Sequence, residues 1–232
     1  MSSTVDVLVE RLRDRRSGKV AFVSHCLLNE NTRYLGGACR ACCVREVVDG
    51  LLDRDIGIVQ MPCPEQLAWG GVLKRHMLRM YGHPRAAALA GIARWYSRFV
   101  FGHIARTVAA QIADYVDAGS TVAGIIGVDG SPSCGVATTV DIAAAIRDIA
   151  DTDPREVTID QQNLLVRRHL EPGAGLFIEQ LQRELTRRRL DVPFLAHDLM
   201  AELDGRSSDL IGQTGAARDS ADISNLVERR SG

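Results

Sequence analysis

Three short apolar runs, each followed within a few residues by a cysteine, most constrain how this chain can fold. The runs are KVAFVSH, IGIVQMP and VAGIIGV, which begin at Lys19, Ile56 and Val122. Each is typical of a buried strand, since it is short, apolar and followed by turn-forming residues. Segments with helical periodicity lie between them, and this alternation favours a mostly parallel sheet with helices on both faces. We therefore expect an α/β fold in a single Rossmann-like domain.

The remaining elements follow from apolar residues at helical or strand spacing. Helices are predicted at 5–13, 40–55, 86–118, 140–150 and 175–189, and a further strand at 192–199. Gly91 and Gly102 are expected to interrupt the third of these helices. The pattern from Thr152 to Gly173 is mixed. We expect residues 1–204 to form the domain and 205–232 a flexible polar tail.

Composition narrows the class of partner. The 28 basic and 29 acidic residues nearly balance, so nothing draws the chain to nucleic acid or to an acidic membrane surface. The first 19 residues lack an apolar stretch that could act as a signal peptide or membrane span, and we expect a cytoplasmic protein. The expected partner is a small molecule, and a homodimer is left open. Thiols stay reduced in that compartment, so the six cysteines are ligands, catalysts or core residues.

Cys26, Cys63 and Cys134 each follow one of the three predicted strands. If these strands are parallel, the three sulfurs reach the crevice at the carboxyl edge of the sheet, where such folds bind ligands. Three thiolates without an evident fourth suggest a metal centre with one open position, and soft ligands favour zinc or an iron–sulfur cluster. An open zinc site usually includes a nitrogen or oxygen ligand. Buried cysteine is also a common core residue, which leaves both interpretations open.

The cysteine-bearing blocks are SHCLLNENTRYLGG, MPCPEQLAWGG and DGSPSCGV. In this order they resemble the signature blocks of the DUF523 family, which includes the 2-thiouracil desulfurases. The resemblance implies a 4Fe-4S cluster bound by Cys26, Cys63 and Cys134 with one open iron. It also implies a cluster-dependent desulfurase that removes sulfur from 2-thiouracil or a related thio-base or nucleoside. Net hydrolysis would release sulfide without an external electron donor.

Several polar residues of these blocks are candidates for the chemistry. Glu65 is the first candidate for the acid or base, although a carboxylate after Pro64 also suits a helix start. Ser131 is a second catalytic candidate. Asp129 and Ser133 could hydrogen-bond the substrate or the cluster, or only shape a turn.

The first block supplies candidates for substrate binding. Arg33 and Tyr34 suit an anionic or aromatic group, and Asn29 could orient a heterocycle through its amide. The alternatives are a solvated charge, a side chain that fills a gap, and a turn former.

Other features depart from the pattern. Cys39 and Cys42 have the C-x-x-C spacing of a redox or zinc site, without a second pair, and Cys43 is expected in the core. His25 could donate to the substrate or act as an acid, but it should point away from the Cys26 side if the strand continues through both residues. The segment 72–103 is expected to form a substrate wall or a subunit contact, with its aromatic residues mostly in the core.

Two other functions compete with the desulfurase. The first is a non-hydrolytic iron–sulfur protein that transfers sulfur or electrons to a partner. The second is a zinc-stabilised α/β binding module.

Overall fold

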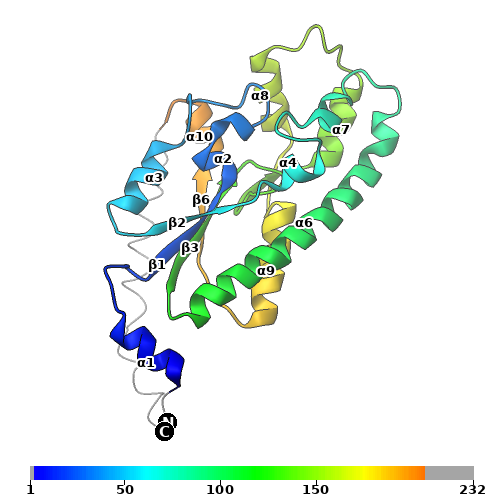
Figure 1. The fold of residues 1–232 in the computed structure, drawn as a ribbon. Coiled ribbons are helices and arrows are strands. Elements are labelled where there is room, and N and C mark those ends of the chain that lie inside the picture. Colours follow the sequence, from blue (N-terminus) through cyan, green and yellow to red (C-terminus); the bar gives the residue numbers. More distant parts are fainter. Residues whose placement is uncertain (1–2, 207–232) are drawn as a thin grey trace.

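The computed structural model describes residues 3–206, and its centre is a four-stranded, all-parallel sheet with the order β2-β1-β3-β6 (Figure 1). The strands are β1 (Lys19–Ser24), β2 (Gly57–Met61), β3 (Thr121–Asp129) and β6 (Phe194–Asp198). The first three coincide with the apolar runs that precede the cysteines. The prediction of an α/β fold with a mostly parallel sheet is therefore confirmed.

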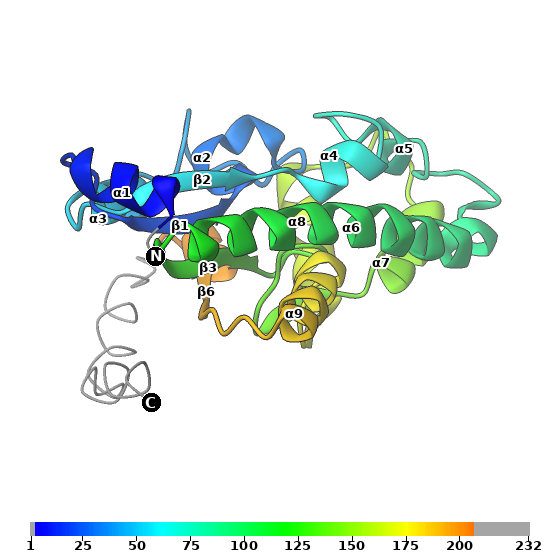
Figure 2. The same ribbon diagram turned by 60° about the horizontal axis from the view of Figure 1, so that its bottom comes forward.

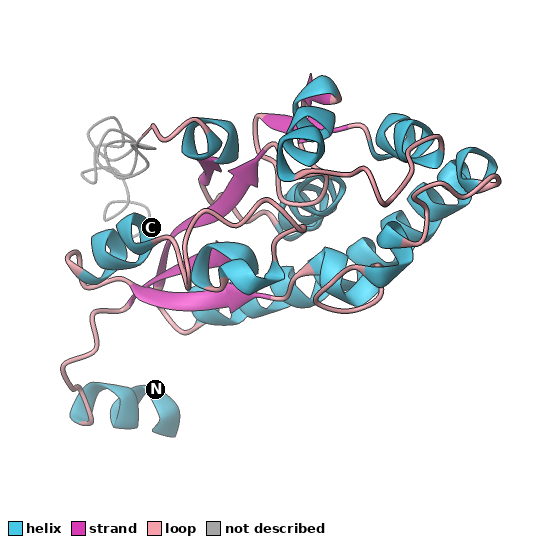
Figure 3. Ribbon diagram, turned by 90° about the horizontal axis from the view of Figure 1, so that it is seen from above, coloured by secondary structure: helices cyan, strands magenta, loops and turns pink. Residues whose placement is uncertain are grey.

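Helices and a small second sheet surround these strands. The elements are α1 (Thr4–Arg11), α2 (His25–Leu28), the 3-10 helix η1 (Glu30–Thr32), α3 (Arg45–Leu52), α4 (Pro64–Ala68), α5 (Arg75–Leu78), α6 (Ala86–Asp117), α7 (Ile142–Ala150), α8 (Ile159–Arg168), α9 (Leu176–Arg188) and α10 (Leu199–Leu203), with β4 (Thr138–Val140) antiparallel to β5 (Leu170–Pro172). In Figure 1, α3 lies to the left of the sheet and α6 and α9 lie to its right. Figure 3 shows the strands from above, with helices on both sides.

The long helix α6 corrects one prediction. It runs without a break through Gly91 and Gly102, which were expected to interrupt it. A glycine inside a helix costs only about 1 kcal/mol relative to alanine. The buried face of α6, which includes Phe101, Ile104 and Val108, offsets that cost by packing beside α9, as Figure 2 shows.

Two other element boundaries differ from the sequence predictions. The segment Thr152 to Gly173, which had a mixed pattern, contains α8 and β5. Thr158 begins α8 with a capping box, since its side chain accepts from the Gln161 N–H while the Gln161 side chain accepts from the Thr158 N–H. The helix expected from residue 40 begins only at Arg45. The predicted tail at 205–232 lies almost entirely outside the described residues.

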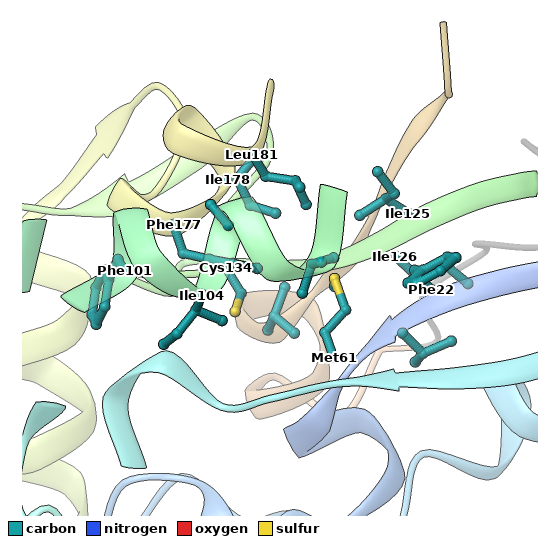
Figure 4. Close-up of a cluster of buried hydrophobic side chains, with 14 of the residues drawn as sticks. Phe22, Met61, Phe101, Ile104, Ile125, Ile126, Cys134, Phe177, Ile178 and Leu181 are labelled. Atoms are coloured by element: carbon teal, nitrogen blue, oxygen red, sulfur yellow. The ribbon is translucent and has the colours of Figure 1, made fainter. Parts of the chain in front are cut away.

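A continuous apolar core fills the space between the sheet and α6 and α9. Its largest fully buried side chains include Phe22, Met61, Phe101 and Phe177. Aromatic residues of this kind each bury about 150–250 Å² and dominate the energy of a core. Figure 4 shows Cys134 among these side chains, so the third cysteine borders the core as well as the cavity described below.

Some apolar residues stay outside the core. Helix α1 buries none of its residues, although its spacing is amphipathic as predicted. Trp95, Tyr96 and Phe99 of α6 are exposed, and Trp95 and Phe99 stack on each other. Only Phe101 of the four aromatic residues in this part of the segment is buried, so the expectation that they lie mostly in the core is wrong. None of the described helices combines the length and the apolar content needed to cross a bilayer.

Candidate functional site

The three loop cysteines line one cavity of about 500 Å³ at the carboxyl ends of β1, β2 and β3. Cys26 lies in α2, directly after β1. Cys63 caps α4, and its Sγ accepts from the Gln66 N–H at 3.4 Å. Cys134 follows β3 and is buried. Parallel strands bring their carboxyl ends to the same edge of a sheet, which is why residues so distant in the sequence share one space.

The loop of Cys134 is held rigidly by backbone contacts. Asp129 Oδ1 accepts from the backbone N–H groups of Val136, Ala137 and Thr138 at 2.9, 2.9 and 3.2 Å. The structure thus places this carboxylate in the turn, and Asp129 is not among the cavity-lining residues. At the other side of the loop, the Phe177 N–H at the start of α9 donates to the Ser133 carbonyl at 3.1 Å.

Glu65 lies at the centre of a polar cluster beside the cysteines. Its Oε1 accepts from Ser133 Oγ at 2.8 Å and from Ser131 Oγ at 3.4 Å. Its Oε2 lies 3.5 Å from Lys74 Nζ. The Ser133 hydroxyl also lies 3.5 Å from the sulfur of Cys134. Because the side chain that caps α4 is that of Cys63, the Glu65 carboxylate is left to contact groups in the cavity wall.

Lys74 is a site residue that the sequence motifs missed. It is only 5% exposed, and its Nζ donates to the backbone carbonyl of Thr32 as well as contacting Glu65. A buried lysine is uncommon unless it is paired. Its backbone is left-handed, with φ of 52°, a conformation that a lysine adopts only under tertiary constraint. The sequence feature that could have indicated the burial of Lys74 is its position directly after the apolar pair Val72 and Leu73.

His25 also lines the cavity, because the condition under which it would point away, a strand that continues through His25 and Cys26, is not met. Strand β1 ends at Ser24, so the alternation of faces along a strand does not extend to His25. Burial and the nearby Lys74 charge lower the pKa of its imidazole. A neutral imidazole is consequently favoured at this wall.

The thiols of the three cysteines interact with one another and with the surrounding charges. Burial raises the pKa of Cys26 to about 12, while the Arg33 and Lys74 charges act in the opposite direction. Burial also raises the pKa values of Cys63 and Cys134, and the neighbouring thiols raise that of Cys134 further. The free thiols are therefore neutral near pH 7, and a bound metal would have to displace their protons.

Arg33 is buried in an ionic network behind the cysteines and also lines the cavity. Its Nη1 donates to Glu202 Oε2 at 2.7 Å and to the Gly37 carbonyl at 3.1 Å, and its Nη2 lies 3.6 Å from Glu30 Oε1. Among residues 3–206, no acceptor lies within hydrogen-bond distance of its Nε and Nη2. The solvated charge considered as an alternative is therefore excluded, and a role in substrate binding stays a prediction.

The remaining candidates are divided between the cavity and its surroundings. Tyr34 lines the cavity and donates from its hydroxyl to Asn163 Oδ1 at 2.8 Å. Asn29 does not line it; its Oδ1 accepts from the backbone and the side chain of Asn31 at 3.2 and 2.9 Å. The structure thus gives Asn29 the local turn contacts considered as the alternative to substrate binding.

The three extra cysteines lie on the loop before α3. Cys39 and Cys42 are exposed, and Cys43 is half-buried, so the expectation that Cys43 lies in the core is wrong. The sulfurs of Cys42 and Cys43 lie 3.4 Å apart. None of the three is among the residues that line the cavity.

In comparisons with known proteins, no protein-family model, curated protein or solved structure matches the chain. Within the described part of the chain, no three histidine, cysteine or carboxylate side chains are placed to hold one metal ion. The three loop cysteines instead surround the cavity from separate loops. The geometry and chemistry of these residues are therefore the basis for a proposed function.

Proposed function

We propose that this protein is a desulfurase that removes sulfur from a thiocarbonyl heterocycle, with a 4Fe-4S cluster held by Cys26, Cys63 and Cys134. One observation carries the proposal: the three cysteines and the Glu65 cluster line the same cavity. The resemblance of the three sequence blocks to the DUF523 family supports it.

The three cysteines that line the cavity match a cluster with one open iron in number and chemistry. A polynuclear cluster takes thiolates at separate irons, which agrees with sulfurs that reach the cavity from three different loops. Arg33 and Lys74 supply positive charge that favours the thiolate of Cys26. When bound, a cluster with one open iron supplies a Lewis acid for a soft leaving group.

The side chains around the cysteines then perform the proton transfers. Glu65 accepts a proton from the attacking water, and Ser133 and Lys74 fix the carboxylate by contacts at 2.8 and 3.5 Å. Water supplies the oxygen of the new C=O bond, and the C–S bond breaks with its electron pair on sulfur. The products are the oxo-heterocycle and hydrosulfide. No electron leaves or enters the pair of reactants, so no redox partner is needed.

The test measures iron, acid-labile sulfide and sulfide release from 2-thiouracil under strictly anaerobic conditions without a reductant. Reconstituted protein should hold about four irons per chain. A Cys134→Ser variant should lose both iron and turnover, while Cys42→Ser, which alters a thiol outside the cavity, should keep both.

A second variant separates the acid or base from the cluster. Glu65→Gln should keep its iron and lower the rate of sulfide release about 10²- to 10⁴-fold. Full iron content in Cys134→Ser would contradict the ligand assignment. Turnover only with an added electron donor would favour a transfer protein, and zinc without iron would favour a binding module.

A further inference from the structure

The cavity has two chemically different parts. The charged side chains among its described lining residues are Arg33, Glu65 and Lys74, and all three belong to the part near the cysteines. The wall contributed by α5, α7, α8 and the segment between the last two is mainly aliphatic. Its lining side chains include Met77, Ile142, Ala145, Ile149, Val157 and Leu165.

The size of the cavity exceeds what a bare heterocycle needs. A space of about 500 Å³ is in the range that accommodates drug-sized ligands. With a cluster bound at the cysteines, a pyrimidine ring placed against the cluster would leave the aliphatic part of the wall to water. Water beside an aliphatic wall forms no hydrogen bonds with it. A ligand with an apolar extension would therefore gain affinity by displacing that water.

The aliphatic part carries few polar groups and no charged side chain among the described lining residues. The Tyr81 hydroxyl donates to Gln162 Oε1, and both residues line the cavity. A phosphate or a carboxylate placed here would lose its hydration without gaining a cation, which is costly. A substituent with ribose hydroxyls would find only Tyr81 and Gln162 as partners among the named polar residues of this wall, whereas the aliphatic side chains offer it no hydrogen bond.

We infer that the substrate carries an apolar substituent of several carbons, which lies against the aliphatic wall formed by α7 and α8. This inference rests on the proposed desulfurase function for the identity of the reacting group. The substrate class is then an alkylated or arylated thiocarbonyl heterocycle. Unmodified thiouracil and thiolated nucleotides are poorer substrates for the same site.

The first test uses compounds without sulfur, so that it does not depend on turnover. Uracil, 6-propyluracil and uridine 5′-monophosphate are titrated into anaerobically reconstituted protein by calorimetry. Each buried methylene is worth about fourfold in affinity, so 6-propyluracil should bind up to about 60-fold more tightly than uracil. Equal or weaker binding of 6-propyluracil, or tightest binding of the nucleotide, overturns the inference.

Variants locate the subsite. Ala145→Leu narrows the aliphatic part from α7 and should lower the affinity for 6-propyluracil about tenfold. The matched control is Ala88→Leu, which adds the same atoms at an exposed position of α6 and should keep the preference. Leu165→Ala removes part of the wall from α8 and should also weaken 6-propyluracil selectively. Unchanged preference in both cavity variants contradicts the assignment of this wall.

Sulfide release then separates the two proposals. The desulfurase with this subsite releases sulfide from 6-propyl-2-thiouracil with a higher kcat/KM than from 2-thiouracil. Release from both compounds with equal kcat/KM overturns the subsite and keeps the desulfurase. A strong binding preference with no sulfide from either compound overturns the desulfurase and keeps the apolar subsite.

Discussion

Replacement of Glu202 by glutamine tests the ionic network that holds Arg33 behind the cysteines. The carboxylate receives the Arg33 guanidinium at 2.7 Å, lies 3.0 Å from His197 Nε2 and contacts Arg40. The side chains of Glu202 and Arg33 are each only 3% exposed. Glutamine keeps the shape and removes the charge. Within the described residues, Arg33 would then keep only Glu30, at 3.6 Å, as a carboxylate partner.

The magnitude follows from the burial of the pair. Loss of one partner of a buried ion pair costs about 3–5 kcal/mol, because the other charge is left uncompensated. Glu30 still compensates part of the Arg33 charge, and the Arg40 side chain is 29% exposed, so water can solvate it. We therefore expect Glu202→Gln to lower the free energy of unfolding by about 3 kcal/mol, at the lower end of that range.

The assay is urea unfolding at pH 7, followed by circular dichroism. The matched control is Glu179→Gln, which removes a carboxylate from a surface cluster with Arg98 and Arg183. Exposed pairs contribute little, so the control should lose no more than about 1 kcal/mol. A loss below about 1 kcal/mol in Glu202→Gln would refute the reasoning, because it would mean that the Arg33 charge is compensated without Glu202.

Three further predictions concern pH, a loop glycine and the first helix. Burial, followed by two neighbouring arginines, lowers the pKa of His197 from 6.5 to about 4, so stability is complete above pH 6.5 and falls as the pH drops to about 4. Urea titrations across this range check it, and a His197→Gln variant should lack that part of the slope. Gly135→Ala should abolish iron binding, measured by iron content, because its Cβ would overlap the backbone carbonyl of Thr138 and displace the third cysteine. Deletion of residues 1–12 should change the free energy of unfolding by less than about 0.5 kcal/mol in the same assay, because α1 buries no residue.

The grouping of the three loop cysteines could be predicted from the sequence because it depends on local pattern and topology. A short apolar run predicts a buried strand. If the neighbouring strands are parallel, the residues that follow each strand lie at the same edge of the sheet. Cys26, Cys63 and Cys134 needed no long-range information beyond that. The orientation of His25 could not be decided in this way, because it depends on the exact residue at which β1 ends, and strand ends are the least defined part of a sequence pattern.

The partners of buried charges could not be predicted in this way. Arg33 pairs with Glu202, 169 residues away, and Lys74 contacts Thr32 and Glu65 across separate loops. Nothing in the local sequence distinguishes these charges from solvated ones, since burial of a charge is decided by the elements that later cover it. Local helix propensity gave a wrong prediction for α6 for the same reason. Tertiary packing stabilises the helix enough to offset the cost of Gly91 and Gly102.

The buried cation beside the cysteines connects the fold to the proposed reaction. A lysine in a largely apolar cavity is stable only when its charge is compensated, and Lys74 is compensated by Glu65 and by the Thr32 carbonyl. This pairing holds a positive charge where thiolates and a leaving hydrosulfide would carry negative charge. It also fixes the Glu65 carboxylate between Lys74 and Ser133 before any substrate binds. Lys74→Met should therefore impair metal uptake and proton transfer together, whereas Glu65→Gln impairs only proton transfer, and the comparison of iron content between these two variants separates the roles of the pair.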